Sequence, residues 1–381
     1  MPAVAVPVCC LSDMDSKTIL TVAVAVLAGS VDGAFCLFQK IDIAATARSE
    51  LSMKKKNTAI VLGATKNYFF AIGSLVLNIK KILPDFADDI LIYYDEIADR
   101  DQAILVDELG CTLLPYDCSF GTHLESTATM HRFTLLSFSI YEIFKHLDEY
   151  RHVLWLDGDI CIQGDISDII RYGPVGMRYG GSQFSAALGR SVYPPWDERP
   201  TNNTGVVLVT DALTDYHSLR EQCYYYTKKF SDTLVLPDQA IFNYVLWKNK
   251  IAITNLTDTY NYTVHHSMNS FSKAKIFHLA CECKFWNHPV LRNLFPVWEE
   301  CYQQWLAMGG SAYTGRQLYY EFGNHFSMLN MLNAIQPDAR LMQLIDEQQR
   351  TIEQLTRNVE DLLGVIQGRK QDAKSESLRS C

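Results

Sequence analysis

Short apolar runs alternate with longer amphipathic stretches through the first half of the chain. The runs Thr58–Ala64 and His152–Leu156 are rich in β-favouring residues and are followed directly by polar residues, which is typical of buried strands. In Phe133–Leu147 the apolar residues recur at intervals of three or four, which predicts a helix. The same pattern predicts strands at Ile90–Tyr94 and Cys111–Leu114, and helices that end at Leu83 and span Gln102–Leu109. This alternation predicts a mostly parallel sheet with helices on both faces, so the expected fold class is α/β and Rossmann-like.

The second half of the chain has a weaker pattern. Tyr172–Pro200 is rich in Gly and Pro with little periodicity, and we expect long loops there. Pro237 suits the first turn of a helix, because its missing N–H has no helical partner at that position. The remaining expected elements are strands at Val206–Val209 and Ile276–Leu279, and helices at Leu236–Trp247 and Val290–Met308. Together these elements predict one domain over residues 58–308.

The C-terminal part has a different period. Spacings of four and three alternate through Leu341–Ile366, with β-branched residues at heptad position a and mostly Leu at position d. This pattern favours a parallel two-stranded coiled coil over residues 338–370, and hence a homodimer, in which the polar Gln348 fixes the register. The alternative is an amphipathic helix packed back on the domain, which needs a wider apolar stripe. Residues 309–337 are then a linker or helical segment, and residues 371–381 a disordered tail.

Near the N-terminus, Ile19–Phe38 is mostly apolar, but glycines and polar residues, Asp32 among them, interrupt it. A membrane-spanning helix needs about 20 apolar residues, and a central aspartate costs about 2.5–3.5 kcal/mol. Residues 1–57 are therefore expected to be a poorly ordered extension or a weak hydrophobic segment. The expected localisation is cytoplasmic, with a type II membrane anchor and a lumenal domain as the alternative, so membrane association stays open.

Composition places the chain among globular proteins. Of its 381 residues 48% are hydrophobic and 20% charged, and the net charge of −9 argues against nucleic acid as a partner. The 11 cysteines form no CxxC pair and no zinc spacing, which favours reduced thiols. Asn202, Asn255 and Asn261 each begin an Asn-x-Thr sequon, a signal that needs a secretory context.

Asp157-Gly158-Asp159 follows the expected strand His152–Leu156 without a spacer. Residues i and i+2 of a strand point to the same side, so both carboxylates emerge together from its C-terminal end. Such hard anionic oxygens suit Mg²⁺ or Mn²⁺, and ligands of open α/β sheets bind outside the carboxyl ends of the strands. A solvated turn is the alternative for an isolated Asp-x-Asp (DxD) motif. The position at a strand end favours metal binding.

Several ordered motifs extend this observation to most of the domain. They are AIVLGATKNYFFAIGSLVLNIKK, HRFTLLSFSIYEIF, LWLDGDICIQGDISDI, NNTGVVLV, LPDQAIFN and HLACECKFW. In this order and spacing, the chain resembles glycosyltransferase family 8 from about Thr58 to Trp305. The resemblance implies a GT-A fold and retaining transfer of a hexose from a UDP-sugar. Mn²⁺ or Mg²⁺ is the implied metal, and a glycan, lipid-linked or protein molecule the implied acceptor.

The resemblance also implies which residues bind the metal and the diphosphate. Asp157 and Asp159 would hold the metal together with His278, and a histidine beside two aspartates suits Mn²⁺. From the residues alone, the favoured interpretation of His278 is an imidazole satisfied inside the core. Arg132 matches a basic residue near the metal and pyrophosphate, although a surface helix charge is the alternative. Lys284 matches the lysine that contacts the leaving diphosphate.

Three further segments match the family motifs expected at the nucleoside and the donor sugar. The first loop is expected against the uridine, with an aromatic ring stacked on the base, and consists of Ala64, Thr65, Asn67 and Tyr68. Asn203 and Gly205 match the segment beside the donor sugar, where a glycine permits close approach. Asp238 and Gln239 match an acidic and amide pair at the sugar, and we expect same-face transfer in which Asp238 orients sugar hydroxyls. With Lys284, these two residues are the expected catalytic set.

Two positions depart from the family pattern. Cys281 replaces a glycine and Phe285 replaces a proline, which allows crowding at the diphosphate and lower activity. The alternative function is therefore a catalytically weak or inactive sugar-nucleotide-binding protein that acts through coiled-coil assembly. The ligand residues are intact, which favours a metal-dependent hexosyltransferase. The identity of the hexose and self-glycosylation on a tyrosine both stay open.

Overall fold

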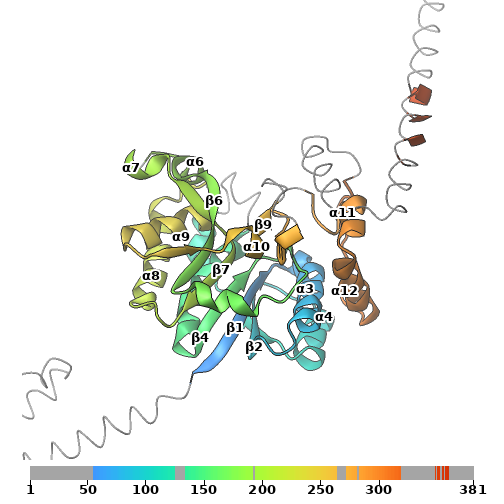
Figure 1. Ribbon diagram of the computed structural model, residues 1–381, viewed down its shortest axis with the longest axis horizontal. Coiled ribbons are helices and arrows are strands. Elements are labelled where there is room, and N and C mark those ends of the chain that lie inside the picture. The colour runs from blue at the N-terminus through green and yellow to red at the C-terminus, as the bar shows by residue number, and fades with distance from the viewer. Residues whose placement is uncertain are drawn as a thin grey trace, which may run out of the picture. The chain divides into compact units, whose positions relative to one another are not determined.

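A mixed, seven-stranded sheet forms the centre of the protein (Figure 1). The computed structural model describes residues 55–124, 134–191, 194–263, 272–280 and 283–318, and the separate positions 348, 350, 351, 354, 355 and 357–359. The strand order is β3-β2-β1-β4-β7-β6-β8. The strands are β1 (Lys56–Ala64), β2 (Asp89–Tyr94), β3 (Thr112–Pro115), β4 (Tyr150–Leu156), β6 (Val175–Gln183), β7 (Pro200–Thr210) and β8 (Ile253–Asn255).

The α/β fold class expected from the sequence is confirmed, in a sheet that is mixed because of its strand β7. Pairs β1–β2, β2–β3 and β6–β8 are parallel, whereas β7 runs antiparallel to both β4 and β6. Apolar runs mark a strand as buried without revealing its direction, which depends on the connections between strands. The pattern of apolar residues could therefore not predict the direction of β7.

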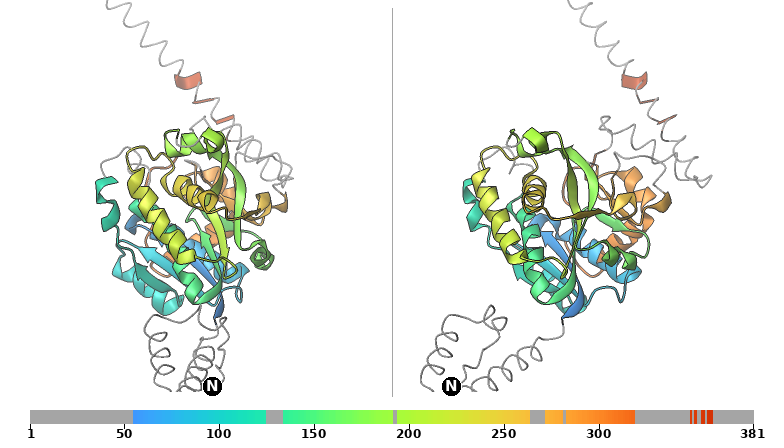
Figure 2. Two further views of the ribbon diagram at one scale, coloured as in Figure 1. Left: turned by 90° about the vertical axis from the view of Figure 1, so that its left-hand side faces the viewer. Right: turned by 60° about the vertical axis from the view of Figure 1, so that its left-hand side comes forward.

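Helices cover both faces of the sheet, because successive residues of a strand point to opposite sides. On β1, Ile60 and Leu62 pack into one apolar core, and Ala59 and Val61 pack into the other. The first core contains α3 (Phe69–Ile82) and α12 (Pro296–Ala307), and the second contains η5 (Leu135–Asp148), α8 (Tyr216–Lys229) and α9 (Pro237–Lys248). Figure 2 shows α8 and α9, in yellow, lying over their face of the sheet.

Shorter helical segments connect these elements. They are η2 (Lys66–Tyr68), α4 (Asp99–Ala103), η3 (Ile104–Glu108), η4 (Ser119–Leu124), η6 (Ser167–Tyr172), α6 (Phe184–Leu188), α7 (Pro194–Asp197), α10 (Thr257–Tyr260) and α11 (Pro289–Leu294). A small second sheet has the order β5-β10-β9. Its strand β5 follows the carboxyl end of β4 closely in the sequence. Its strands are β5 (Ile160–Ile162), β9 (Tyr262–Thr263) and β10 (Ile276–His278).

Two predicted elements need correction. The prediction of long loops over Tyr172–Pro200 was wrong, because this stretch contains β6, α6 and α7. Register shifts interrupt the pairing of β6 with β7, so its residues lack a regular two-residue alternation of buried and exposed positions. The helix expected over Val290–Met308 is divided in two, because Pro296 lacks the N–H needed inside a helix and begins α12 instead.

Both ends of the chain lie largely outside the described residues. The apolar stretch Ile19–Phe38 and most of the expected coiled coil belong to these parts. The described positions between 348 and 359 are helical and exposed, so the coiled coil stays a prediction. Within the described parts of the chain, no helix combines the length and the apolar character needed to cross a membrane.

Gly73 gives a test of the packing between α3 and α12. A Cβ atom at this position would lie 2.2 Å from the buried ring of Trp305, closer than van der Waals contact allows. Helix propensity alone predicts that Gly73→Ala stabilises the protein by about 1 kcal/mol, whereas overpacking predicts a loss of about 1–3 kcal/mol. We expect the loss, measured as the free energy of unfolding in urea, and expect it to shrink when Trp305→Leu is added. Stabilisation by Gly73→Ala alone would contradict this packing.

Candidate metal centre and donor site

Asp157, Gly158 and Asp159 form the connection between β4 and β5. The backbone N–H of Asp157 donates to the carbonyl of Gly205 at 2.9 Å, and the carbonyl of Asp159 accepts from Leu279 at 3.0 Å. Backbone bonds to β7 and to the end of β10 therefore fix both aspartates. The expected exit of two carboxylates from the end of β4 agrees with this geometry.

His278 reaches the two aspartates because β10 pairs with β5, which places His278 opposite Ile160. Its Nε2 atom lies 3.6 Å from Asp157 Oδ2 and 3.2 Å from Asp159 Oδ1. Neighbouring ligands of an octahedral metal with bonds of 2.0–2.1 Å are about 3 Å apart, so the spacing is close to that of a ligand set. The three residues offer ligand atoms that all lie within 4.8 Å of one another. This donor set fits a divalent cation such as Mn²⁺.

Charge compensation at the site is shared among its neighbours. Lys284 forms an ion pair with Asp159 and also donates to the carbonyl of Leu279 at 2.6 Å. Although burial acts to raise the pKa of Asp159, Lys284 and His278 outweigh it and hold that pKa below its usual value. Burial raises the pKa of Asp157, whose Oδ1 accepts from the indole of Trp155 at 2.8 Å. The pair thus consists of one strongly anionic carboxylate and one that a cation would help to ionise.

Gly205 has a more specific role than the sequence indicated. A Cβ atom at this position would lie 2.0 Å from Cε1 of His278 and 2.4 Å from its Nδ1. The imidazole therefore packs directly on the backbone of β7, where any side chain would displace it. The glycine thus admits the ring of His278, and its expected place beside the donor sugar stays a prediction.

The residues expected at the donor sugar lie next to this centre. Asn203 Nδ2 is 3.4 Å from Gln239 Oε1, and Gln239 donates to Thr201 Oγ1 at 2.8 Å. At the start of α9, Asp238 accepts from the hydroxyl of Thr204 at 2.8 Å. Burial raises the pKa of Asp238, and the bond from Thr204 opposes that change. These two sets of bonds join side chains of β7 to the start of α9, and the charge of Asp238 acts to raise the pKa of Asp157.

The first loop lies at the carboxyl end of β1. Ala64 is the last residue of β1, and Thr65 and Asn67 lie at the following turn of η2. The ring of Tyr68 is 46% exposed and contacts Trp286 edge-on at 6.1 Å between ring centroids. Because Trp286 follows Lys284 by two residues, this contact joins the first loop to the segment that carries the lysine.

Three further positions singled out in the sequence are not seen at the site. Arg132 and Cys281 lie outside the described residues. Phe285 is fully buried and packs against Phe295 and Trp298, at 5.0 and 5.7 Å between ring centroids. The phenylalanine thus points into the core, so its bulk is accommodated away from the carboxylates.

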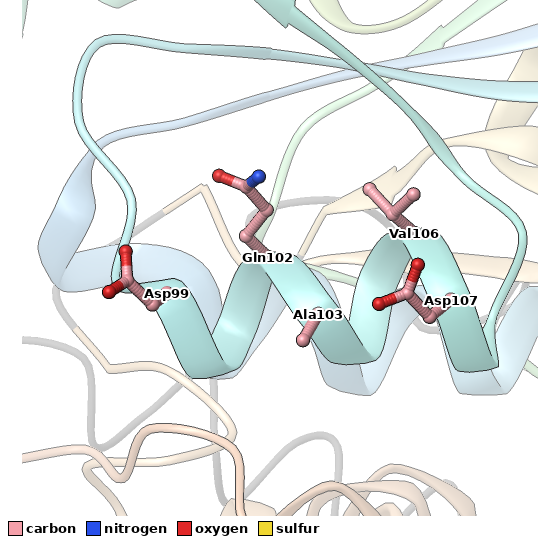
Figure 3. Close-up of a pocket in the computed structure, with 5 residues that line it drawn as sticks. All are labelled: Asp99, Gln102, Ala103, Val106 and Asp107. Carbon is pink, nitrogen blue, oxygen red and sulfur yellow. The ribbon is translucent and has the colours of Figure 1, made fainter.

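A shallow pocket on α4 and η3 is a different feature (Figure 3). It is lined by Asp99, Gln102, Ala103, Val106 and Asp107. None of these residues belongs to the expected site. The pocket carries no part of the argument for metal or nucleotide binding.

Sequence reasoning missed Trp155 and Thr204, and it considered Asn261 only as part of a sequon. Trp155 precedes Asp157 by two residues, so the two-residue period of a strand could have placed both on one side. Asn261 is fully buried and lies within hydrogen-bonding distance of His278. Its sequence context gave no signal of that contact, which depends on the position of β9 next to β10.

Comparisons with known proteins identify a family and a fold for this chain. The family model described as glycosyl transferase family 8 matches residues 59–289. The structure is similar to that of the galactosyltransferase LgtC in complex with donor and acceptor sugar analogs, with a TM-score of 0.52 and 13% identity over 66% of this chain and 99% of that chain. It is also similar to the bifunctional glycosyltransferase WbbM, with a TM-score of 0.51 and 15% identity over 68% of this chain and 52% of that chain. These likenesses confirm the expected GT-A fold. A comparison with curated proteins gives no match.

Gly205 offers a test of His278 as a ligand. Gly205→Ala should displace the imidazole and weaken Mn²⁺ binding by at least about tenfold, the size of effect seen when the support of a ligand is lost. Electron paramagnetic resonance of free Mn²⁺ measures this affinity. Gly164→Ala is the control, since its Cβ atom would make an ordinary 3.4 Å contact with Lys275. Wild-type affinity in Gly205→Ala would remove His278 from the ligand set.

Proposed function

The chain belongs to glycosyl transferase family 8, and on that premise we propose that it is a metal-dependent hexosyltransferase with a UDP-sugar as donor. The acceptor is a glycan, a lipid-linked molecule or a protein, and the configuration of the transferred sugar is retained. One observation carries the proposal. The ligand atoms of Asp157, Asp159 and His278 converge within 4.8 Å at the carboxyl end of β4, where open α/β sheets bind their ligands.

Asp157, Asp159 and His278 would hold Mn²⁺ or Mg²⁺. When bound there, the cation would stabilise the negative charge that develops on the diphosphate as the bond to the sugar breaks. Lys284 lies against Asp159 and supplies a second positive charge in the same place. Its ammonium group can bind a phosphate oxygen as a point charge, which assists departure of the diphosphate.

The first loop suits the nucleoside. Tyr68 presents a half-exposed ring at the carboxyl end of the sheet, which can stack on the uracil base. Ala64 ends β1 beneath it, and Thr65 and Asn67 supply polar groups for the ribose and base. The contact between Tyr68 and Trp286 makes base binding and the placement of Lys284 mutually dependent.

For retention we propose transfer on one face of the sugar, supported by the nature of the groups expected beside the donor sugar. Gln239 is an amide, which is a poor nucleophile, and it lies beside Asn203. Transfer on one face of the sugar then requires no covalent intermediate on the enzyme. The bond from C1 to the diphosphate breaks, the acceptor oxygen forms its bond to C1 on that face, and its proton passes to the departing diphosphate. Asp238, held by Thr204, would orient sugar hydroxyls.

The C-terminal segment is proposed to assemble two copies of the chain. The heptad pattern of residues 338–370 supports a parallel coiled coil with Gln348 at a core position. Among its described residues, Leu355 and Val359 are 58% and 54% exposed. Apolar side chains this exposed at core heptad positions are consistent with a partner helix.

Hydrolysis of the donor tests the metal site. We expect Mn²⁺-dependent release of UDP from one of UDP-glucose, UDP-galactose or UDP-GlcNAc, and its loss with EDTA. Asp159→Asn should lower the rate by at least about 100-fold, because it removes a ligand charge and the partner of Lys284. Asp165→Asn is the matched control, since Asp165 accepts a bond from Ser167 at an exposed turn. Equal activity in Asp159→Asn and the control would contradict the metal assignment.

Truncation tests the assembly. Deletion of Asp338–Cys381 should halve the molar mass measured by light scattering, because it removes the heptads. The domain over residues 58–308 keeps every proposed site residue, so donor hydrolysis should persist. A molar mass equal to that of two truncated chains would show that the heptads do not hold the assembly.

A further inference from the structure

We propose that Asn261 is a positioning residue that sets the ring tautomer of His278, through a relay that starts at the backbone of Gly205. The relay consists of the N–H of Gly205, the side chain of Asn203, the side chain of Asn261 and the imidazole. The inference rests on the proposed function, since a ligand nitrogen must present a lone pair to the metal. It adds a residue outside the ligand set on which metal binding depends.

The orientation of the relay is fixed at its first bond. The backbone N–H of Gly205 donates to Asn203 Oδ1 at 2.9 Å. A backbone N–H is a donor in every state of the protein, whereas a side-chain amide presents either its oxygen or its nitrogen. The atom of Asn203 that faces Gly205 must therefore be its oxygen. Its Nδ2 then faces Gln239 Oε1, in agreement with the weaker 3.4 Å contact.

The second bond carries the orientation to Asn261. Asn203 Oδ1 is an acceptor, so the atom of Asn261 that lies 2.8 Å from it must be the donor Nδ2. The other atom of the same amide, Oδ1, then faces His278 Nδ1 at 3.0 Å. Asn261 has no exposed surface, and an amide in that position keeps its hydrogen bonds because water cannot replace them.

The third bond determines which ring nitrogen of His278 carries the hydrogen. Since Asn261 Oδ1 only accepts, Nδ1 of His278 must carry a hydrogen. Its other ring nitrogen, Nε2, is then the atom that takes a cation, and it is the atom that lies 3.2 Å from Asp159 and 3.6 Å from Asp157. A neutral imidazole with its hydrogen on Nε2 would point that hydrogen at the metal position. The relay excludes this tautomer and so keeps the ligand atom open.

The burial of Asn261 also bears on its sequon. Asn261 begins an Asn-x-Thr sequon, but it is fully buried and bonded on both sides in the folded protein. Its side chain is therefore occupied by the relay rather than offered to solvent. The same triplet that signals modification in sequence serves here as support for a ligand.

Two substitutions of Asn261 separate positioning from a merely structural role. Asn261→Leu removes the acceptor for Nδ1, and we expect Mn²⁺ affinity to fall about 10–100-fold, the range for the partners of ligating histidines. Asn261→Asp keeps an acceptor oxygen for Nδ1 but loses the donor to Asn203, so it should retain more of the affinity than Asn261→Leu. Asn243→Leu is the matched control, because Asn243 is also fully buried and bonded through its amide but contacts Asn202 and Gln239.

The tautomer is read directly by ¹⁵N NMR of the histidine rings in metal-free protein, with the His278 signals assigned by their loss in His278→Gln. Wild-type protein and Asn261→Asp should show the hydrogen on Nδ1, and Asn261→Leu should show a population with the hydrogen on Nε2. Unfolding in urea checks that each variant is folded.

The outcomes distinguish this inference from the proposed function. If wild-type protein binds no Mn²⁺, the metal proposal fails, while the NMR spectra still test the relay. If wild-type protein binds Mn²⁺ and folded Asn261→Leu retains both the affinity and the Nδ1–H tautomer, the relay is overturned. An equal loss of affinity in Asn243→Leu and Asn261→Leu, with no change of tautomer, would also overturn it.

Discussion

The site depends on two carboxylates held side by side at the end of β4, where their mutual repulsion requires positive charge close by. The pairing of β5 with β10 brings His278 next to Asp159 from a distant part of the sequence, and the cationic side chain that meets this requirement lies just beyond β10. Lys284 follows a few residues later and pairs with the same carboxylate. A divalent cation would complete the compensation, and the strand ladders keep the ligand atoms in position to receive it.

Packing around these charges explains several residues that carry no chemistry themselves. Gly205 is needed because the ring of His278 lies against its backbone. In the segment that carries Lys284, Phe285 is anchored in the core, and Trp286 contacts Tyr68 of the first loop. Lys284 therefore directly precedes two buried aromatic residues and forms its ion pair with Asp159. This arrangement joins the first loop to the segment that carries Lys284.

The parts of the fold predictable from sequence were those with a strong local period. The strand His152–Leu156 and the helix from Pro237 both formed, since burial of their apolar residues and the conformation of proline act locally. The bulged strand β6 lacked such a period and was missed. His278 could be placed only through the family motifs, because its partners come from other strands. Asn261 gave no signal at all, since its role depends on hydrogen bonds that only the tertiary structure brings together.

The most direct test of this account is the location of Mn²⁺ by anomalous diffraction from crystals grown with Mn²⁺ and UDP. The account predicts one strong peak bounded by Asp157, Asp159 and Nε2 of His278, with the diphosphate of UDP on its open side and near Lys284. A bound UDP with no peak at these three residues, or a peak elsewhere on the protein, would contradict the central claim that they form the metal site.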